Sequence, residues 1–265
     1  MAPPPLPKLI LYRIDGACSL AAHMTLHELQ IYFTTTRMVI NPTTQKAEAA
    51  DGTLTYDDYV REIHPNGQVP ALEVYPPESH SNGTTTPENK NETPEGEPHK
   101  PSPPVAITEN PAILMYIADL ATSLNPNTAP KLAGSTLLER AQVTSWLTFL
   151  SGSVHGQAFG ALYRPRRYID GERFPQAETA VREAGRRSLD LFYGQIEDRL
   201  VEGKWAVGEG MTVADFNLYV FYRWGIDLGI KMKEVYPKWS DLARRLEGRP
   251  SVKTAVWLEG LGSVF

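Results

Sequence analysis

The single cysteine of the 265-residue chain, Cys18, lies in the stretch "GACSLAAH", directly before an expected helix. The first N–H groups of a helix have no partner within it, and the helix dipole is positive at that end, so an anion is stabilised there. A free thiol has a pKa of about 8.5, and such a position can lower that pKa. The site therefore suits a thiolate, either that of Cys18 or that of a ligand. A packed, unreactive cysteine is the alternative.

A proline at the head of an expected strand could help to bind a peptide-like ligand. The segment "QVPALEV" places Pro70 directly after Val69. If the Val69–Pro70 bond is cis, the N–H and C=O groups of Val69 turn outward, and a ligand can pair with them as an added strand. An ordinary proline in an edge strand is the alternative.

An acid and an amide stand together at the start of another expected helix. In "TENPAI", Glu109 can hold an ammonium group, while the Asn110 side chain and the nearby N–H groups can hold a carboxylate. Together the two residues could bind the head group of an α-amino acid. Helix capping alone is the alternative.

A histidine near the end of a long helical pattern could face a cleft. Three, four and seven residues before His155 stand Gly152, Ser151 and Thr148, so an α-helix would place all four on one face. A histidine among small and polar residues suits proton transfer or ligand binding. A histidine that is simply packed or exposed is the alternative.

Three arginines follow in "YRPRRY", at Arg164, Arg166 and Arg167. Arginine side chains bind anions well, so this turn could meet an anionic substrate. A solvated basic turn is the interpretation that the sequence favours.

The residues Thr212 and Asp215 have the T-x-x-D spacing of a capping box in front of an apolar run. We assign this motif a structural role.

The first half of the chain reads as strands and helices in the order βαβ and then ββα. The expected strands are 8–13, 32–40, 71–75 and 105–108; the expected helices follow Leu20 to Leu29, 56–63 and 111–120. This order predicts a mixed four-stranded sheet covered by helices.

Residues 76–104 interrupt this pattern with eight prolines, five glutamates and no hydrophobic residue. Such a segment cannot bury enough surface to offset its ordering entropy. We expect a disordered insertion in a hairpin loop, with a docking tether as the alternative.

The second half is helical in character. Helical runs are expected at 137–154, 176–202, 213–225, 239–246 and 252–258. The predicted fold class is therefore α+β, with a thioredoxin-like domain at 1–121 that includes the insertion, a linker at 122–134 and an all-helical domain at 135–265.

Composition narrows the possible functions. The net charge of −5 comes from 26 basic and 31 acidic residues that are well mixed, so no basic stripe for nucleic acid is expected. One cysteine excludes an internal disulfide and a multi-cysteine metal site, and it indicates a reducing compartment. No segment approaches about 18 consecutive apolar residues. We expect a cytoplasmic protein that binds neither membranes nor metal.

Taken together, these motifs resemble the cytosolic glutathione transferase superfamily, and most closely its bacterial-type beta class. The resemblance covers nearly the whole chain apart from the proline-rich start and the insertion at 76–104. Matching stretches include "GACSLAAHMTLHE", "HPNGQVPALEV", "ITENPAILMYIADL", "ERAQVTSWLTFLSGSVHG", "GMTVADFNLY" and "RWGIDLGIKM". The resemblance implies a thioredoxin-like domain and a helical domain, glutathione bound between them as co-substrate, and a homodimer.

The resemblance also assigns the residues around the glutathione sulfur. It places Cys18 against the sulfur and His155 near it, both as catalytic residues. It makes Val69, before a cis Pro70, the partner of the cysteinyl backbone of glutathione.

Further residues follow from the same resemblance. Glu109 and Asn110 would hold the γ-glutamyl end of glutathione, and Lys46 would match a lysine that meets its glycyl carboxylate. Thr212 and Asp215 would be the folding signal of the superfamily.

The chain departs from the family pattern at two places. Gly156 follows the histidine where the family usually has lysine, which removes a positive charge near the thiolate. Asn110 stands where the family usually has serine.

The first functional hypothesis is conjugation of glutathione to a small hydrophobic electrophile. The residues expected to line the electrophile pocket are Thr148, Ser151, Gly152, Tyr163 and Arg164. The second is Cys18-dependent chemistry through a mixed disulfide, such as thiol exchange, dehalogenation, lyase or isomerase reactions. The third is a glutathione-binding or scaffold module without catalysis.

Overall fold

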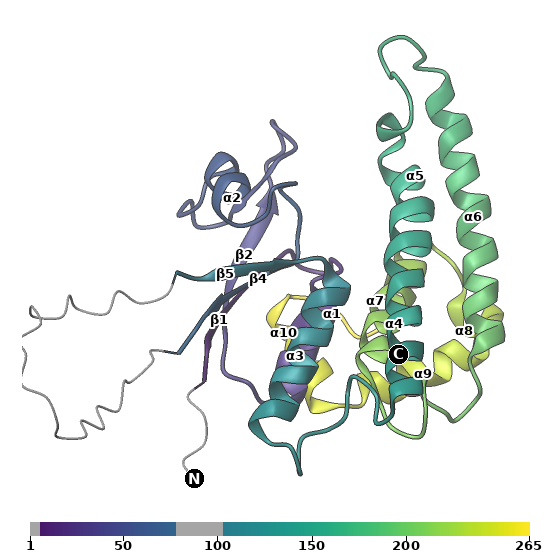
Figure 1. The fold of residues 1–265 in the computed structure, drawn as a ribbon. Helices are drawn as coiled ribbons and strands as arrows, with labels where there is room; N and C mark the ends of the chain where they lie inside the picture. Colours follow the sequence, from purple (N-terminus) through teal and green to yellow (C-terminus); the bar gives the residue numbers. More distant parts are fainter. Residues whose placement is uncertain (1–5, 78–102) are drawn as a thin grey trace, which may run out of the picture.

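The computed structural model describes residues 6–77 and 103–265. Most of the expected insertion at 76–104 therefore lies outside the described residues. The described chain forms a mixed sheet with helices on both faces, followed by a helical assembly (Figure 1).

The sheet has five strands in the order β3-β2-β1-β4-β5. They are β1 (Lys8–Arg13), β2 (Thr34–Ile40), β3 (Ala47–Ala49), β4 (Ala71–Tyr75) and β5 (Val105–Thr108). Strand β2 runs parallel to β1, and the other neighbours are antiparallel.

The expectation of four strands is thus wrong by one edge strand. β3 pairs with β2 through the register Met38↔Ala49 and Ile40↔Ala47. Its sequence, "AEA", has no β-branched or aromatic residue, so it carries no strand signal of its own.

Successive side chains of β1 point to opposite faces of the sheet, so they belong to two separate apolar layers. Leu9 and Leu11 point into the large core that α1 (Leu20–Glu28) and α3 (Asn110–Leu124) cover. Tyr12 belongs to a second, smaller cluster on the other face, under α2 (Tyr56–Glu62). Figure 1 shows α2 on the side of the sheet away from the helical half.

The helical half is built on one long hairpin (Figure 1). Its first arm is α4 (Leu137–Thr148), a π-helical stretch η1 (Phe149–Phe159) and α5 (Gly160–Tyr163), which continue one another. A short 3₁₀ turn, η2 (Pro165–Arg167), leads toward the second arm, α6 (Ala177–Arg199). The two arms approach closely at Gly185, where an added Cβ would lie 2.7 Å from the backbone nitrogen of Leu162.

Four helices follow the hairpin, and two of them join the helical half to the sheet half. They are α7 (Val213–Asp227), α8 (Met232–Val235), α9 (Pro237–Glu247) and α10 (Pro250–Leu258). Most of α7 is buried, and both α7 and α10 pack against α1. One hydrophobic core therefore extends from the sheet into the helical half.

The expected capping box is present at the start of α7. The backbone N–H of Thr212 donates to Asp215 Oδ2 at 2.7 Å, and the Ala206 N–H donates to Oδ1 at 2.8 Å. Burial raises the pKa of Asp215 to about 6, against these hydrogen bonds. The motif fixes both the helix start and the preceding loop.

Candidate functional site

Cys18 lies in the turn between β1 and α1, and it meets the segment around Pro70. The Val69–Pro70 peptide bond is cis. The buried Cys18 thiol donates to the carbonyl oxygen of Val69, with Sγ and O 3.4 Å apart. Two motifs that are 51 residues apart in the chain thus form one corner.

The expectation of a lowered Cys18 pKa is wrong for this structure. Burial raises the pKa of the thiol to about 12. The backbone N–H groups of Cys18 and Ser19 and the positive charge of Arg164 act in the opposite direction, and Glu109 raises the pKa further. The helix start does favour the thiolate, but the loss of solvent outweighs it.

Glu109 and Asn110 stand at the start of α3 as expected. Glu109 has φ +69° and is exposed, a left-handed conformation that is unusual for a residue with a side chain. The buried Asn110 donates through Nδ2 to Asn217 Oδ1 at 3.1 Å. Within residues 6–77 and 103–265, its own Oδ1 is buried without a hydrogen-bond partner. An unpaired buried acceptor is costly, so a ligand N–H would be favourable there.

His64 is a residue that the sequence interpretation did not single out. It is buried, its Nδ1 accepts from the Asn66 N–H at 3.2 Å, and burial lowers its pKa. The charge of Glu109 opposes that shift, so Glu109 acts on both His64 and Cys18. No sequence signal marks His64, because its place beside Glu109 depends on the packing of distant segments.

His155 lies in the π-helical stretch and packs against aromatic rings. Its ring centroid is 5.1 Å from that of Trp224 and 6.0 Å from that of Phe221. Burial, together with the charges of Arg164 and Arg167, lowers the pKa of His155 to about 4. The side chain is therefore neutral at neutral pH.

The expected polar face around His155 rests on α-helical spacing, which does not hold here. From Phe149 to Phe159 the helix is of the π type, with more residues per turn, so the faces rotate relative to an α-helix.

The helical half also holds the loop that carries Cys18. Trp224 Nε1 donates to the carbonyl of Gly16 at 2.8 Å, and the Gly16 N–H donates to Glu259 Oε2 at 2.8 Å. Since Trp224 also contacts His155, one tryptophan connects the cysteine loop to the histidine.

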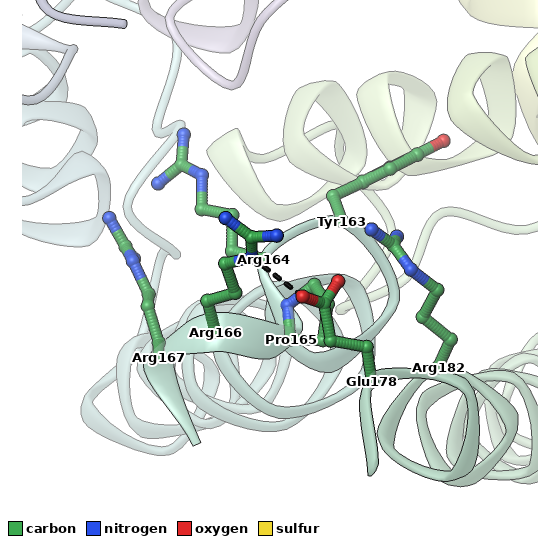
Figure 2. A pocket seen from close by; sticks show the side chains of 7 residues that line it. All are labelled: Tyr163, Arg164, Pro165, Arg166, Arg167, Glu178 and Arg182. Atoms are coloured by element: carbon green, nitrogen blue, oxygen red, sulfur yellow. Dashed lines mark hydrogen bonds and ion pairs between the residues drawn. The ribbon is translucent and has the colours of Figure 1, made fainter. Parts of the chain in front are cut away.

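A pocket of about 410 Å³ lies between the end of the first hairpin arm and α6 (Figure 2). Its lining residues are Tyr163, Arg164, Pro165, Arg166, Arg167, Glu178 and Arg182. The charge of Arg164 opposes the rise in the pKa of Cys18. Of the residues expected to line an electrophile pocket, Tyr163 and Arg164 line this one, whereas Thr148, Ser151 and Gly152 do not.

Lys46 is exposed, just before β3. Its Nζ lies over the ring of Tyr56, 4.5 Å from the centroid. That ring packs closely on Gly67, where an added Cβ would be 2.4 Å from Tyr56 Cε2. Lys46 is therefore connected through Tyr56 to the turn that precedes Val69.

The part of the chain that the structure describes shows no group of three or more metal-ligating side chains. No helix in that part is long and apolar enough to cross a membrane.

Comparisons with known proteins agree on one family. Residues 153–250 match the family described as "Glutathione S-transferase, C-terminal domain". The glutathione S-transferase GstA of Escherichia coli O157:H7 is 26% identical over 251 residues, covering 95% of this chain and 98% of that protein.

Two solved structures are similar over nearly their full length. A bacterial beta class glutathione S-transferase from Sphingomonas chungbukensis is 29% identical with a TM-score of 0.65, over 96% of this chain and 100% of that one. A sphingomonad glutathione S-transferase complexed with glutathione is 28% identical with a TM-score of 0.64, over the same shares.

Proposed function

Because the chain is similar to glutathione S-transferases over nearly its whole length, we propose that it is a cytosolic glutathione transferase that transfers the glutathionyl group, through its sulfur, to an electrophilic carbon. The observation that carries the proposal is the corner formed by Cys18 and the Val69 carbonyl beside the cis Pro70. A similar chain has been solved in complex with glutathione, which supports a glutathione site at this corner.

The residues present fit the chemical groups of glutathione. The backbone of Val69 would pair with the cysteinyl part, whose sulfur would lie near Cys18. The exposed carboxylate of Glu109 and the unpartnered Oδ1 of Asn110 would accept N–H bonds from the γ-glutamyl ammonium group. Lys46, near the Gly67 turn, would meet the glycyl carboxylate.

The proposed step is nucleophilic substitution. The glutathione thiol loses its proton to solvent, the thiolate forms a C–S bond at the electrophilic carbon, and the leaving group departs with its bonding electron pair. The N–H groups at the start of α1 and the neutral thiol of Cys18 would stabilise the thiolate. His155 is neutral, so its contribution would be an N–H donor rather than a cation.

Arg164 is our candidate for the positive charge that Gly156 does not provide. It acts on Cys18 in the direction that favours a thiolate. A guanidinium keeps its charge even where burial lowers its pKa, as it does at Arg164.

The test is glutathione-dependent turnover of 1-chloro-2,4-dinitrobenzene by the full chain and its variants. We expect Cys18→Ala and His155→Ala each to lower kcat/KM about tenfold or more, because each removes a donor at the thiolate. Gln157→Ala, an exposed neighbour in η1, is the matched control and should keep full activity. Full activity in both Cys18→Ala and His155→Ala would remove these residues from the mechanism.

The raised pKa of Cys18 argues against the competing reaction, in which its own thiolate attacks a disulfide. In that reaction oxidised glutathione would leave one half on Cys18 and release the other as a thiol. Mass spectrometry after incubation with oxidised glutathione distinguishes the two: a stable adduct, with activity lost in Cys18→Ser, would favour exchange. Retention by immobilised glutathione without turnover of any electrophile would instead indicate a binding module.

We further propose a homodimer in the cytoplasm. The superfamily resemblance supports the dimer, and the single cysteine suits a reducing compartment. Light scattering coupled to gel filtration would give twice the chain mass of 29.5 kDa if the proposal is right.

A further inference from the structure

The pocket between η2 and α6 is strongly basic. Four arginines and one glutamate line it, and Figure 2 shows that they come from two neighbouring segments, around η2 and the start of α6. Binding of a purely apolar electrophile would not require four arginines in the pocket wall. The composition of its wall points instead to an anion.

Two of these four arginines are already engaged. Arg166 Nε pairs with Glu178 Oε1 at 2.6 Å, and Arg182 donates to the carbonyl of Leu162. Over residues 6–77 and 103–265, Arg164 and Arg167 line the pocket with neither an ion pair nor a side-chain hydrogen bond. Since Arg164 is already our candidate for the charge near the thiolate, Arg167 is the remaining arginine for a ligand anion.

The turn that carries Arg167 lies against the helix that carries His155. The O–H of Tyr168, the next residue, donates to the carbonyl of Gly156 at 2.8 Å. On the other side of the pocket, Tyr163 stacks on Phe159, whose ring centroid is 4.9 Å from that of Trp224, the residue that contacts His155. A ligand anion at Arg167 would therefore be on the same side of the helix arm as these groups, and the charge of Arg167 accordingly lowers the pKa of His155. The rest of such a ligand could then reach the sulfur that Cys18 and His155 are proposed to hold.

We propose that the electrophilic co-substrate is a carboxylic acid, and that Arg167 binds its carboxylate while the electrophilic carbon faces the glutathione sulfur. This inference rests on the proposed function and names its substrate class. A guanidinium binds a carboxylate through two parallel hydrogen bonds, which fixes the orientation of the ligand as well as its charge. The acid replaces the small hydrophobic electrophile expected from the sequence.

A matched pair of aryl halides tests the proposal. 4-Chloro-3-nitrobenzoate carries the carboxylate, and 4-chloro-3-nitrobenzamide has the same shape without charge. In both, the glutathione thiolate bonds to the chlorine-bearing carbon, chloride leaves with the bonding electrons, and the thiol proton goes to solvent. Each kcat/KM is divided by the uncatalysed rate constant, which removes the difference in intrinsic reactivity.

We expect Arg167→Gln to lower the acid-to-amide ratio about tenfold or more, since it removes a charged hydrogen-bond donor. The amide should be affected much less. Arg187→Gln removes the same charge from an exposed position of α6 outside the pocket, and it should leave the ratio unchanged.

Glu178→Gln tests the same idea in the opposite direction. It removes the carboxylate of the pocket and releases Arg166 from its ion pair. The acid-to-amide ratio should rise. A ratio that falls or stays constant would contradict an electrostatic role for the pocket.

An acid-to-amide ratio that Arg167→Gln leaves unchanged would overturn the proposal. If the KM for glutathione is raised in the same variant, Arg167 would be assigned to glutathione itself.

If neither halide is turned over with glutathione, turnover of 1-chloro-2,4-dinitrobenzene decides on the proposed function, and a binding measurement decides separately on the pocket. Calorimetric titration with 3-nitrobenzoate should then show binding to the full chain that Arg167→Gln loses and Arg187→Gln keeps. Equal binding to all three proteins would overturn the acid site.

Discussion

Cys18 and His155 lie in surroundings that strongly favour their neutral forms. Burial raises the pKa of the thiol to about 12 and lowers that of the imidazole to about 4. A neutral thiol that already donates to the Val69 carbonyl can donate in the same way to a glutathione thiolate. These residues thus suit a role in which Cys18 polarises the sulfur of glutathione rather than bonding to it.

Cys18 should therefore react slowly with alkylating reagents. In the native protein at pH 8 we expect iodoacetamide to modify it at least about a hundredfold more slowly than free glutathione, because little thiolate is present. The urea-unfolded chain provides the control, and a single cysteine makes the adduct unambiguous. A thiolate titration in ultraviolet absorbance with a midpoint below pH 8 would contradict this expectation.

His155 should make stability depend on pH. Its folded-state pKa of about 4 lies below the ordinary value of 6.5, so between these values the unfolded chain binds more protons. Stability should be lost as the pH falls through this window, with a contribution on the order of 3 kcal/mol.

The measurement is urea unfolding of the wild type and of His155→Gln at pH 7.5 and pH 5. Burial also lowers the pKa values of His27 and His64, so only the difference between the two proteins reports on His155. The variant should lose less stability on acidification. An identical loss in both proteins would show that His155 is not buried in its neutral form.

At the scale of elements, the hairpin of η1, α5 and α6 positions both His155 and the arginine pocket. Gly185 lets α6 approach the first arm, where a Cβ would lie 2.7 Å from Leu162 N and 2.9 Å from Ala158 O. Gly152, on the first arm, has open space around the same added atom. Close packing therefore excludes a side chain at Gly185 but not at Gly152.

Substitution by alanine at each position tests this difference. Gly185→Ala should destabilise the protein by about 2 kcal/mol, because backbone atoms must move to admit the methyl group. Gly152→Ala should stabilise it by about 0.5 to 1 kcal/mol, since alanine loses less backbone entropy in a helix. Thermal unfolding monitored by circular dichroism checks both, and a lower melting temperature for Gly152→Ala would refute the second expectation.

Local sequence patterns predict most of these elements but not their finer geometry. Strands β4 and β5 have the residue limits expected from their turns and apolar runs, and the box at Thr212 starts α7. The π-helical stretch was not predicted, because π-helices are rare and the apolar pattern was interpreted with α-helical spacing throughout. Likewise, the link from Arg164 to Cys18 depends on how two distant segments pack, which no local pattern contains.

At the scale of the whole molecule, Glu259 ties the C-terminal segment to the cysteine loop. Its buried carboxylate accepts the Gly16 N–H at 2.8 Å and lies 2.8 Å from His23 Nδ1 on α1. A second polar link joins Arg249 and Glu28. Because the two halves also share one core, they should unfold together.

Two probes, one in each half of the chain, test this cooperativity. All five tryptophans lie between residues 146 and 257, whereas Cys18 reports on the sheet half. Tryptophan fluorescence and Cys18 labelling should therefore give the same urea midpoint. Glu259→Ala should lower both midpoints together, because it leaves buried polar groups unpaired. We expect it to reduce the free energy of unfolding by about 3 kcal/mol.

Glu202→Ala, at an exposed site with no ion pair within the described ranges, is the control and should unfold like the wild type. The informative alternative is labelling of Cys18 in Glu259→Ala at low urea while the tryptophan transition stays in place. Glu259 would then hold only the loop from Gly16 to Cys18, and the halves would not depend on it for their joint stability. A shift of both urea midpoints would instead mean that Glu259 stabilises the cysteine loop and the contact between the two halves. A substitution that displaces the loop would then also lower the stability of the whole molecule.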